Sequence, residues 1–143
     1  MTDRSTILAT LDQGFAAIAA GDAEAAVAGF APDVVAFELQ PPLEFSGDEA
    51  RDPDGLRAWF ATWQAPPTIA LRDPRVEIEG PLAVVYGLAN MRGRKTDGAD
   101  IDLWYRATFV LRDGKGAWQM IHTHTSVPFR MDGSETAALD LRP

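Results

Sequence analysis

The feature that most constrains the fold is a change of pattern near residue 68. Before it, the apolar residues of 7–18 recur at helical spacing, and Asp52-Pro53 has the form of a helix N-cap followed by a first-turn proline. After it come four β-like runs separated by turn residues, at 68–79, 82–94, 101–112 and 118–127. Helices followed by a meander of strands predict an α+β domain, and the short turns predict antiparallel pairing.

The first half of the chain is predicted to hold three helices and one short strand. Gly21 ends the first helix, and Asp22 caps a second, shorter one. A strand follows at 34–39 and ends at two prolines. The third helix presents an apolar face formed by Leu56, Trp59, Phe60 and Trp63. We expect a single domain over 1–131, and a tail over 132–143 that frays or packs on a neighbour.

Composition and charge exclude several classes of function. The 143 residues suit one domain, and the formal net charge of −8 argues against binding to nucleic acid or to anionic membranes. The chain has no cysteine, which excludes disulfides and thiolate metal sites. No apolar stretch reaches the roughly 18 residues of a membrane span, and the apolar start is interpreted as a helix, not as a signal peptide. We therefore expect a cytoplasmic protein.

Both histidines of the chain lie in the last β-like run. His122 and His124 should point to the same side of the sheet, because alternate residues of a strand share a face. The expected hairpin register puts Thr108 opposite His122 and Arg106 opposite His124. Three roles are open for the pair: a structural one, acid–base chemistry, or metal binding with Glu38 as a third ligand.

This register divides the sheet into two faces of different composition. One face mixes large apolar groups with polar ones, as ligand pockets do, and carries Trp104, Arg106, Thr108, Val110, Trp118, Met120, His122 and His124. The other face is more apolar and would form either the core or a subunit interface. It carries Leu103, Tyr105, Ala107, Phe109, Leu111, Ile121, Thr123 and Thr125. The mixed composition favours the first face as the ligand site.

Glu38 is the main candidate for a general base. It lies among apolar residues just before the prolines, and a carboxylate that faces a cavity has its pKa raised by desolvation. The alternative is an ordinary solvent-facing glutamate. Arg106 is a candidate clamp for a carboxylate or enolate oxygen, with a structural salt bridge as its alternative. Tryptophans more often pack in a core, but we include as candidate ligand contacts Trp59, Trp63, Trp104, Tyr86 and Met120.

Several segments together resemble the nuclear-transport-factor-2-like superfamily, and within it the bacterial SnoaL-like, ketosteroid-isomerase-like proteins. They are the helix junction Ala20-Gly21-Asp22 and the stretches Phe37 to Leu43, Asp102 to Thr108, and Trp118 to Phe129. The resemblance covers nearly the whole chain. It implies a conical α+β barrel (cystatin-like), in which N-terminal helices pack on a curved antiparallel sheet around a deep cavity. It also implies a homodimer formed through the outer sheet face, which we expect to be the more apolar one.

The catalytic pattern of ketosteroid isomerases carries over only in part. Their general base corresponds to Glu38, but their oxyanion-hole tyrosine corresponds to Gly14, and no carboxylate stands near Arg106 to serve as the second donor. The candidate residues still combine into one hypothesis, a cofactor-independent enzyme. Glu38 would take a proton from a substrate, His122 or His124 would return it, and Arg106 would orient an oxygen-rich group.

The reaction class expected from this hypothesis is isomerisation, cyclisation or dehydration of a small, mostly apolar carbonyl compound. Two alternatives use the same fold without chemistry. One is a non-catalytic protein that binds a small molecule in the same cavity. The other is a dimeric accessory domain that works through its dimer surface. The fold alone does not separate the three, because one fold hosts many functions.

Overall fold

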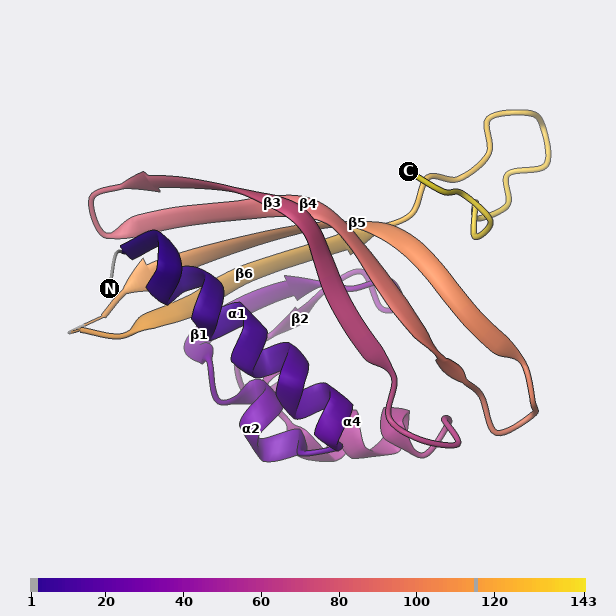
Figure 1. Ribbon diagram of the computed structural model, residues 1–143, viewed down its shortest axis with the longest axis horizontal. Helices are drawn as coiled ribbons and strands as arrows, with labels where there is room; N and C mark the ends of the chain where they lie inside the picture. Colours follow the sequence, from indigo (N-terminus) through magenta and orange to yellow (C-terminus); the bar gives the residue numbers. More distant parts are fainter. Residues whose placement is uncertain (1–2, 115) are drawn as a thin grey trace.

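The structure is a computed structural model that describes residues 3–114 and 116–143. The helices all lie on one side of a curved sheet that does not close into a barrel (Figure 1). In chain order the elements are α1 (Asp3–Ala20), α2 (Ala23–Val27), β1 (Phe30–Phe37), β2 (Phe45–Ser46), α3 (Gly47–Ala50), α4 (Pro53–Phe60), β3 (Thr68–Glu79), β4 (Leu82–Arg94), β5 (Asp100–Asp113) and β6 (Trp118–Ser126).

α1 ends, and α2 and α4 begin, where their capping residues indicate, but α4 ends at Phe60, so Trp63 lies outside the predicted third helix. Gly21, with a φ of 70°, follows the last residue of α1, because glycine takes this left-handed conformation without strain. The Asp22 side chain accepts a hydrogen bond from the backbone N–H of Ala25 at 3.1 Å and caps α2. Asp52 caps α4 in the same way, 2.9 Å from the N–H of Asp54. Among the described residues, no helix is both long and apolar enough to cross a membrane.

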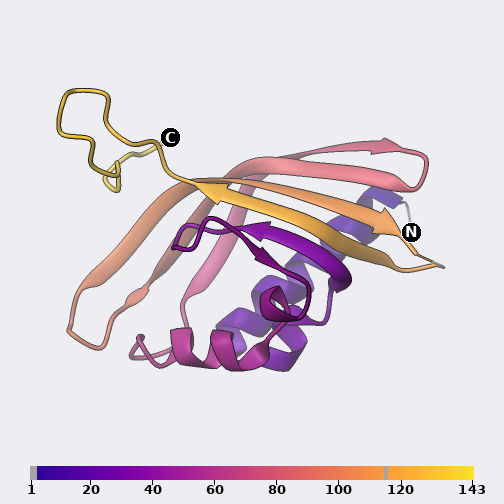
Figure 2. The ribbon, with the colours of Figure 1, turned by 180° about the vertical axis from the view of Figure 1, so that it is seen from behind.

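The four strands after residue 68 confirm the predicted antiparallel meander. β3 and β4 have the predicted bounds, and β5 and β6 differ from them by one residue. The sheet order is β2-β1-β6-β5-β4-β3. The first long strand therefore lies beside the last, and β1 pairs with β6 in parallel, as Figure 2 shows from behind. This parallel pair was not predicted, and neither were the short elements β2 and α3.

A β-bulge in β6 changes the predicted register of the last hairpin. Leu111 pairs with Met120, but the next pair is Val110 with His122, so Ile121 is an extra residue in β6. One extra residue reverses the alternation of side chains along a strand. Met120 therefore lies on the same face as Leu111, whereas His122 lies on the opposite face.

The histidine partners predicted from the sequence are consequently wrong by two residues. Thr108 lies opposite His124, not His122, and Arg106 lies opposite Ser126. The predicted mixed face also separates, because the residues before the bulge, Trp118 and Met120, turn to the helix side of the sheet, where both are buried.

The core lies between α1 and the more apolar face of the sheet. Ile7 and Leu11 of α1 are almost fully buried against a cluster that includes Val85, Tyr105, Phe109, Leu111, Trp118 and Met120. Burial of the α1 stripe requires an apolar partner surface, and this face supplies it. The expectation that the more apolar face forms the dimer side is therefore wrong, because the helices already cover it.

The C-terminal segment folds back toward the sheet after leaving β6 (Figures 1 and 2). The N–H of Ala138 donates to the carbonyl of Pro128 at 2.8 Å, and Ala138 is 3% exposed. The guanidinium of Arg142 lies 2.8 Å from the carboxylate of Asp102 on β5. The division of the chain into a domain of 1–131 and a tail of 132–143 stays a prediction.

Candidate functional site

A pocket of about 500 Å³ lies between the helices and the sheet. Residues of the four helices and of the six strands line it, and its apolar part includes Ile18, Phe30, Leu56, Trp59, Met91 and Leu103. Its polar part is formed by Glu38, Gln40, Glu49, Asp52, Tyr105 and Thr125. An apolar cavity with a few polar groups is the usual composition of a small-molecule site.

Glu38 reaches this pocket because it follows β1 directly. Ala36 of β1 pairs with Thr123 of β6, so Glu38, two residues further, shares the helix-facing side of the sheet. The Thr123 hydroxyl donates to a Glu38 carboxylate oxygen over a long distance of 3.5 Å. The buried Thr125 hydroxyl is close enough to favour the charged carboxylate as well, although no hydrogen bond of ordinary geometry joins them.

The pKa of Glu38 is raised above its usual value. Glu38 as a whole residue is exposed, but the protein around its carboxylate desolvates that group and so disfavours its charged form. The hydroxyls of Thr123 and Thr125 act in the opposite direction and do not outweigh this desolvation. A carboxylate with a raised pKa in a pocket is a better proton acceptor than an ordinary surface glutamate.

Tyr105 is a functional candidate that the sequence reasoning missed. It lies on β5, lines the same pocket, and is 7% exposed. Its pKa is raised by burial and by the negative charge of Glu38, which places the two groups in the same part of the site. Its phenol makes no hydrogen bond to another side chain in the described part of the chain, which leaves it available to a ligand. The position was assigned to the face not favoured for ligand, so the incorrect face assignment hid it.

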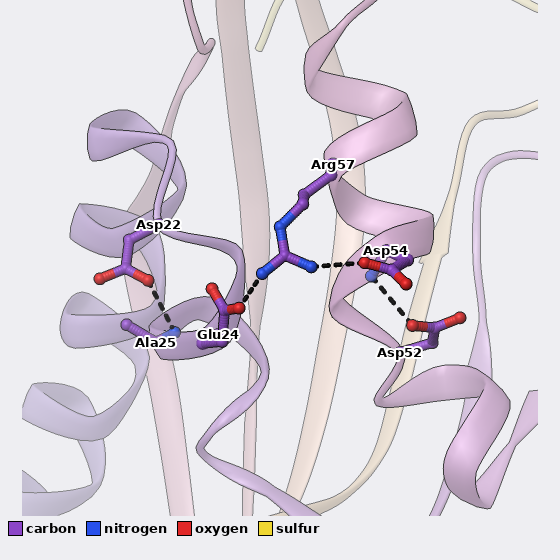
Figure 3. Close-up of polar contacts among 6 residues, drawn as sticks. All are labelled: Asp22, Glu24, Ala25, Asp52, Asp54 and Arg57. Carbon is purple, nitrogen blue, oxygen red and sulfur yellow. Dashed lines mark hydrogen bonds and ion pairs between the residues drawn. The ribbon is translucent and has the colours of Figure 1, made fainter.

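The pocket wall formed by α2 and α4 is held together by Arg57. Its guanidinium forms ion pairs with Glu24 of α2 and Asp54 of α4 (Figure 3). Leu56 and Trp59, on either side of Arg57 in the sequence, line the pocket. These ion pairs are exposed and stabilise the fold by only about 0–1 kcal/mol. They connect the two short helices at the pocket wall without contributing much to stability.

The other predicted ligand contacts separate into three places. Trp59 lines the pocket together with Glu38. Trp63 and Met120 are buried, and the Trp63 indole lies under the Lys95 ammonium at 3.8 Å. The remaining three lie on the outer face of the sheet, away from the helices, at Tyr86, Trp104 and Arg106.

The histidines also lie on the outer face. Their rings contact Phe37, with centroid distances of 4.8 Å for His122 and 5.6 Å for His124. His122 Nδ1 is 2.7 Å from the carbonyl oxygen of Val35. The sheet separates both rings from the pocket side chain of Glu38, so the geometry does not support the predicted proton transfer between them. Within residues 3–114 and 116–143, no group of three His, Asp or Glu side chains is arranged to hold a metal ion.

Solved structures place this architecture in the nuclear-transport-factor-2-like class. A protein of unknown function from Pseudomonas putida, described as NTF2-like, is 27% identical with a TM-score of 0.84, over 100% of this chain and 99% of that one. A proposed dehydratase of the NTF2-like family from Streptomyces avermitilis is 18% identical with a TM-score of 0.73, over 87% and 95%. The CaMKII hub of S. rosetta is 24% identical with a TM-score of 0.69, over 88% and 97%.

The family model of the SnoaL-like domain matches residues 7–130, and the chain therefore belongs to the SnoaL-like domain family. Curated proteins gave no match. The family and the NTF2-like fold confirm the resemblance and the α+β fold class predicted from the sequence.

Proposed function

We propose that the chain binds a small, mostly apolar carbonyl compound in the helix-side pocket and catalyses proton transfer on it. The observation that carries this proposal is the Glu38 carboxylate, which has a raised pKa and lies beside Tyr105 in a pocket of about 500 Å³. The similarity to a proposed dehydratase, an enzyme class that works by proton transfer, is consistent with it.

The two polar groups have different roles in the proposed reaction. The Glu38 carboxylate accepts a proton from the carbon next to the carbonyl group, and the C–H electron pair forms the enolate. The Tyr105 hydroxyl donates a hydrogen bond to the oxygen on which negative charge develops. Glu38, now a carboxylic acid, returns the proton to a conjugated carbon, which completes an isomerisation. Alternatively its acidic proton exchanges with solvent, and a solvent hydrogen is delivered to the original carbon, which completes an exchange. The proposal thus assigns to Tyr105 the donor role that the resemblance left open, because Gly14 stands at the position of the ketosteroid-isomerase tyrosine.

Deuterium exchange tests this proposal directly. 2-Acetonaphthone, an apolar aryl ketone that fits the pocket volume, should exchange its methyl protons with D₂O faster in the presence of the protein, as followed by proton NMR. Because the charged carboxylate is the active form, the rate should rise with pH through a midpoint above the usual value of 4.5 and then level off. A rate equal to that of buffer at every pH would contradict the proposed chemistry.

The accessory role is a second candidate, favoured by the C-terminal segment. Four large apolar side chains of this segment are 43–86% exposed: Phe129, Met131, Leu139 and Leu141. An exposed apolar group of this kind is typical of a surface that binds another protein. The similarity to a CaMKII hub is consistent with assembly, and the occupant proposed here is a second copy, giving a homodimer.

Light scattering after size-exclusion chromatography tests the homodimer. The wild-type chain should have the mass of two copies, and the double substitution Leu139→Ser with Leu141→Ser should shift it toward the mass of one. Leu43→Ser is the matched control, since Leu43 is 96% exposed but lies outside the C-terminal segment. A monomeric wild type, or an equal shift in the control, would contradict this candidate.

A further inference from the structure

The outer face of the sheet carries a second hollow, which we call the outer dish. It has a volume of about 490 Å³, and its main side chains are Arg72, Arg75, Tyr86, Leu88, Arg106 and Thr108. These residues come from β3, β4 and β5. The outer dish and the helix-side pocket therefore lie on opposite faces of one sheet.

The outer dish concentrates positive charge on a strongly acidic chain. Its lining holds three arginines, one aspartate (Asp73) and Pro143, the last residue of the sequence, whereas the chain as a whole has a net charge of −8. Within the dish Arg72 pairs with Asp73 at 3.8 Å, and outside it Arg94 pairs with Asp100 at 2.8 Å. Within the described part of the chain, Arg75 and Arg106 pair with no carboxylate. Unpaired guanidinium groups that meet in one hollow favour an anionic ligand.

Neutral neighbours hold these two guanidinium groups and leave their ends free. Arg106 donates through Nε to the Ser126 hydroxyl at 3.2 Å, so its two Nη groups are available for a ligand. Arg75 lies over the Tyr86 ring, 5.8 Å from its centroid. Groups positioned before a ligand arrives lose less entropy when it binds. The arrangement is therefore suited to bidentate recognition of an oxyanion.

The register shows what lies between the charges. Arg72 pairs with Leu88, and Leu88 pairs with Arg106, so two arginines flank one exposed leucine across three adjacent strands. Arg75 pairs with Tyr86, and Tyr86 pairs with Thr108, so Arg75 lies two strands from Arg106 and two residues further along. With strands about 4.8 Å apart, this separates the backbones of Arg75 and Arg106 by roughly 12 Å. Leu88 is 39% exposed and forms, with the Tyr86 ring, an apolar floor. A bare inorganic ion would leave this floor uncovered.

We propose that the outer dish is a second binding site, for a small oxyanion carried on an apolar body. The guanidinium groups of Arg75 and Arg106 hold a phosphate or carboxylate group, and the apolar body lies on Leu88 and Tyr86. The site does not depend on the chemistry of the helix-side pocket, because none of its residues lines that pocket. Failure of the ketone exchange would leave this inference standing.

Phenyl phosphate is the probe, with the full-length isotope-labelled protein as the receptor. Titration followed by amide NMR should shift the signals of Tyr86, Leu88 and Arg106 and give saturable binding. Arg106→Gln should weaken this binding by at least about tenfold, since it removes charge-assisted hydrogen bonds. Arg94→Gln is the matched control, because Arg94 lies on the same sheet but is already paired with Asp100, and it should leave the affinity within about twofold.

Two further probes distinguish the contribution of the oxyanion from that of the apolar body. Benzoate should bind at the same residues, and inorganic phosphate should bind more weakly than phenyl phosphate because it leaves the apolar floor bare. Arg106→Gln must keep the wild-type unfolding temperature within a few degrees, and Arg75→Gln gives a second reading of the same loss. No saturable shift at the outer dish, or equal loss in Arg94→Gln, overturns the proposal, as does phenyl phosphate binding elsewhere on the chain.

Discussion

Replacing Glu38 with glutamine should lower the protein-catalysed rate of ketone exchange by about 10²- to 10⁴-fold, which is the usual contribution of a general base. Glutamine has nearly the same shape but cannot accept a proton at neutral pH. Binding of the ketone should persist, because the apolar wall that includes Trp59 and Met91 is unchanged. The measurement is exchange by proton NMR together with ketone affinity from quenching of tryptophan fluorescence.

The control for this variant is Glu44→Gln. It makes the same chemical change at an exposed position on the same loop, outside the pocket, and should keep the full exchange rate. Tyr105→Phe provides a second readout, since loss of the hydroxyl removes only the oxyanion donor and should slow exchange less than Glu38→Gln. Retention of more than half the rate in Glu38→Gln would exclude the carboxylate as the base.

The unfolding temperature of Glu38→Gln shows whether a lower exchange rate comes from the lost base or from an unfolded protein. The pKa of Glu38 is raised in the folded state, so the folded protein holds its proton more tightly than the unfolded chain does. The stability that this group contributes is therefore complete at low pH and is lost as pH rises through the folded pKa. At pH 7 the charged Glu38 carboxylate lowers the free energy of unfolding. Glu38→Gln should therefore unfold at the same temperature as the wild type or at a higher one.

Local sequence signals accounted for most of the fold. The bounds of β3 to β6 follow from alternating β-forming runs and from turn residues such as Gly80-Pro81, which act over a few residues only. The start of α4 follows from the cap at Asp52. These features depend on neighbours in the chain, so a single sequence contains them.

The features that the sequence did not predict depend on pairing between residues far apart in the chain. The parallel pairing of β1 with β6 joins residues more than 80 positions apart, and no local pattern marks it. The bulge at Ile121 has no composition signal either, yet it sends His122 and His124 to the outer face. Tyr105 was missed for another reason, since its face of β5 was interpreted as core or interface, whereas Tyr105 lines the helix-side pocket. A one-residue slip exchanges the two faces of a strand, so it exchanges the candidate sites as well.

The candidate site was predictable where it depended on residue type and not on register. Glu38 was singled out as a carboxylate among apolar residues, and it does line the pocket with a raised pKa, though its catalytic role stays a proposal. Trp59 faces the pocket because the helical period of α4 places it there. The predicted role of Arg106 depended on which face of the sheet lines the pocket. The structure puts Arg106 on the opposite face, in the outer dish.

Truncating Leu111 to alanine should lower the free energy of unfolding by about 3–5 kcal/mol, as measured by urea denaturation. Leu111 is fully buried on β5, in the cluster that receives α1. The loss combines the transfer free energy of the removed methyl groups with the cavity that they leave. Domains of this size are stable by about 5–15 kcal/mol, so this loss removes a substantial part of the stability of the fold.

Leu43→Ala is the matched control for this effect. It is the same chemical change at a side chain that is 96% exposed, and the free energy of unfolding should stay within about 0.5 kcal/mol of wild type. The pair also decides between the two roles that the sequence left open for the Leu111 face. A core position loses unfolding free energy at every protein concentration, whereas a subunit interface would lose association first and would show a concentration-dependent unfolding midpoint. Because α1 covers this face, Leu111→Ala should show the first behaviour, and a loss below about 1 kcal/mol would contradict the packing of α1 on the sheet.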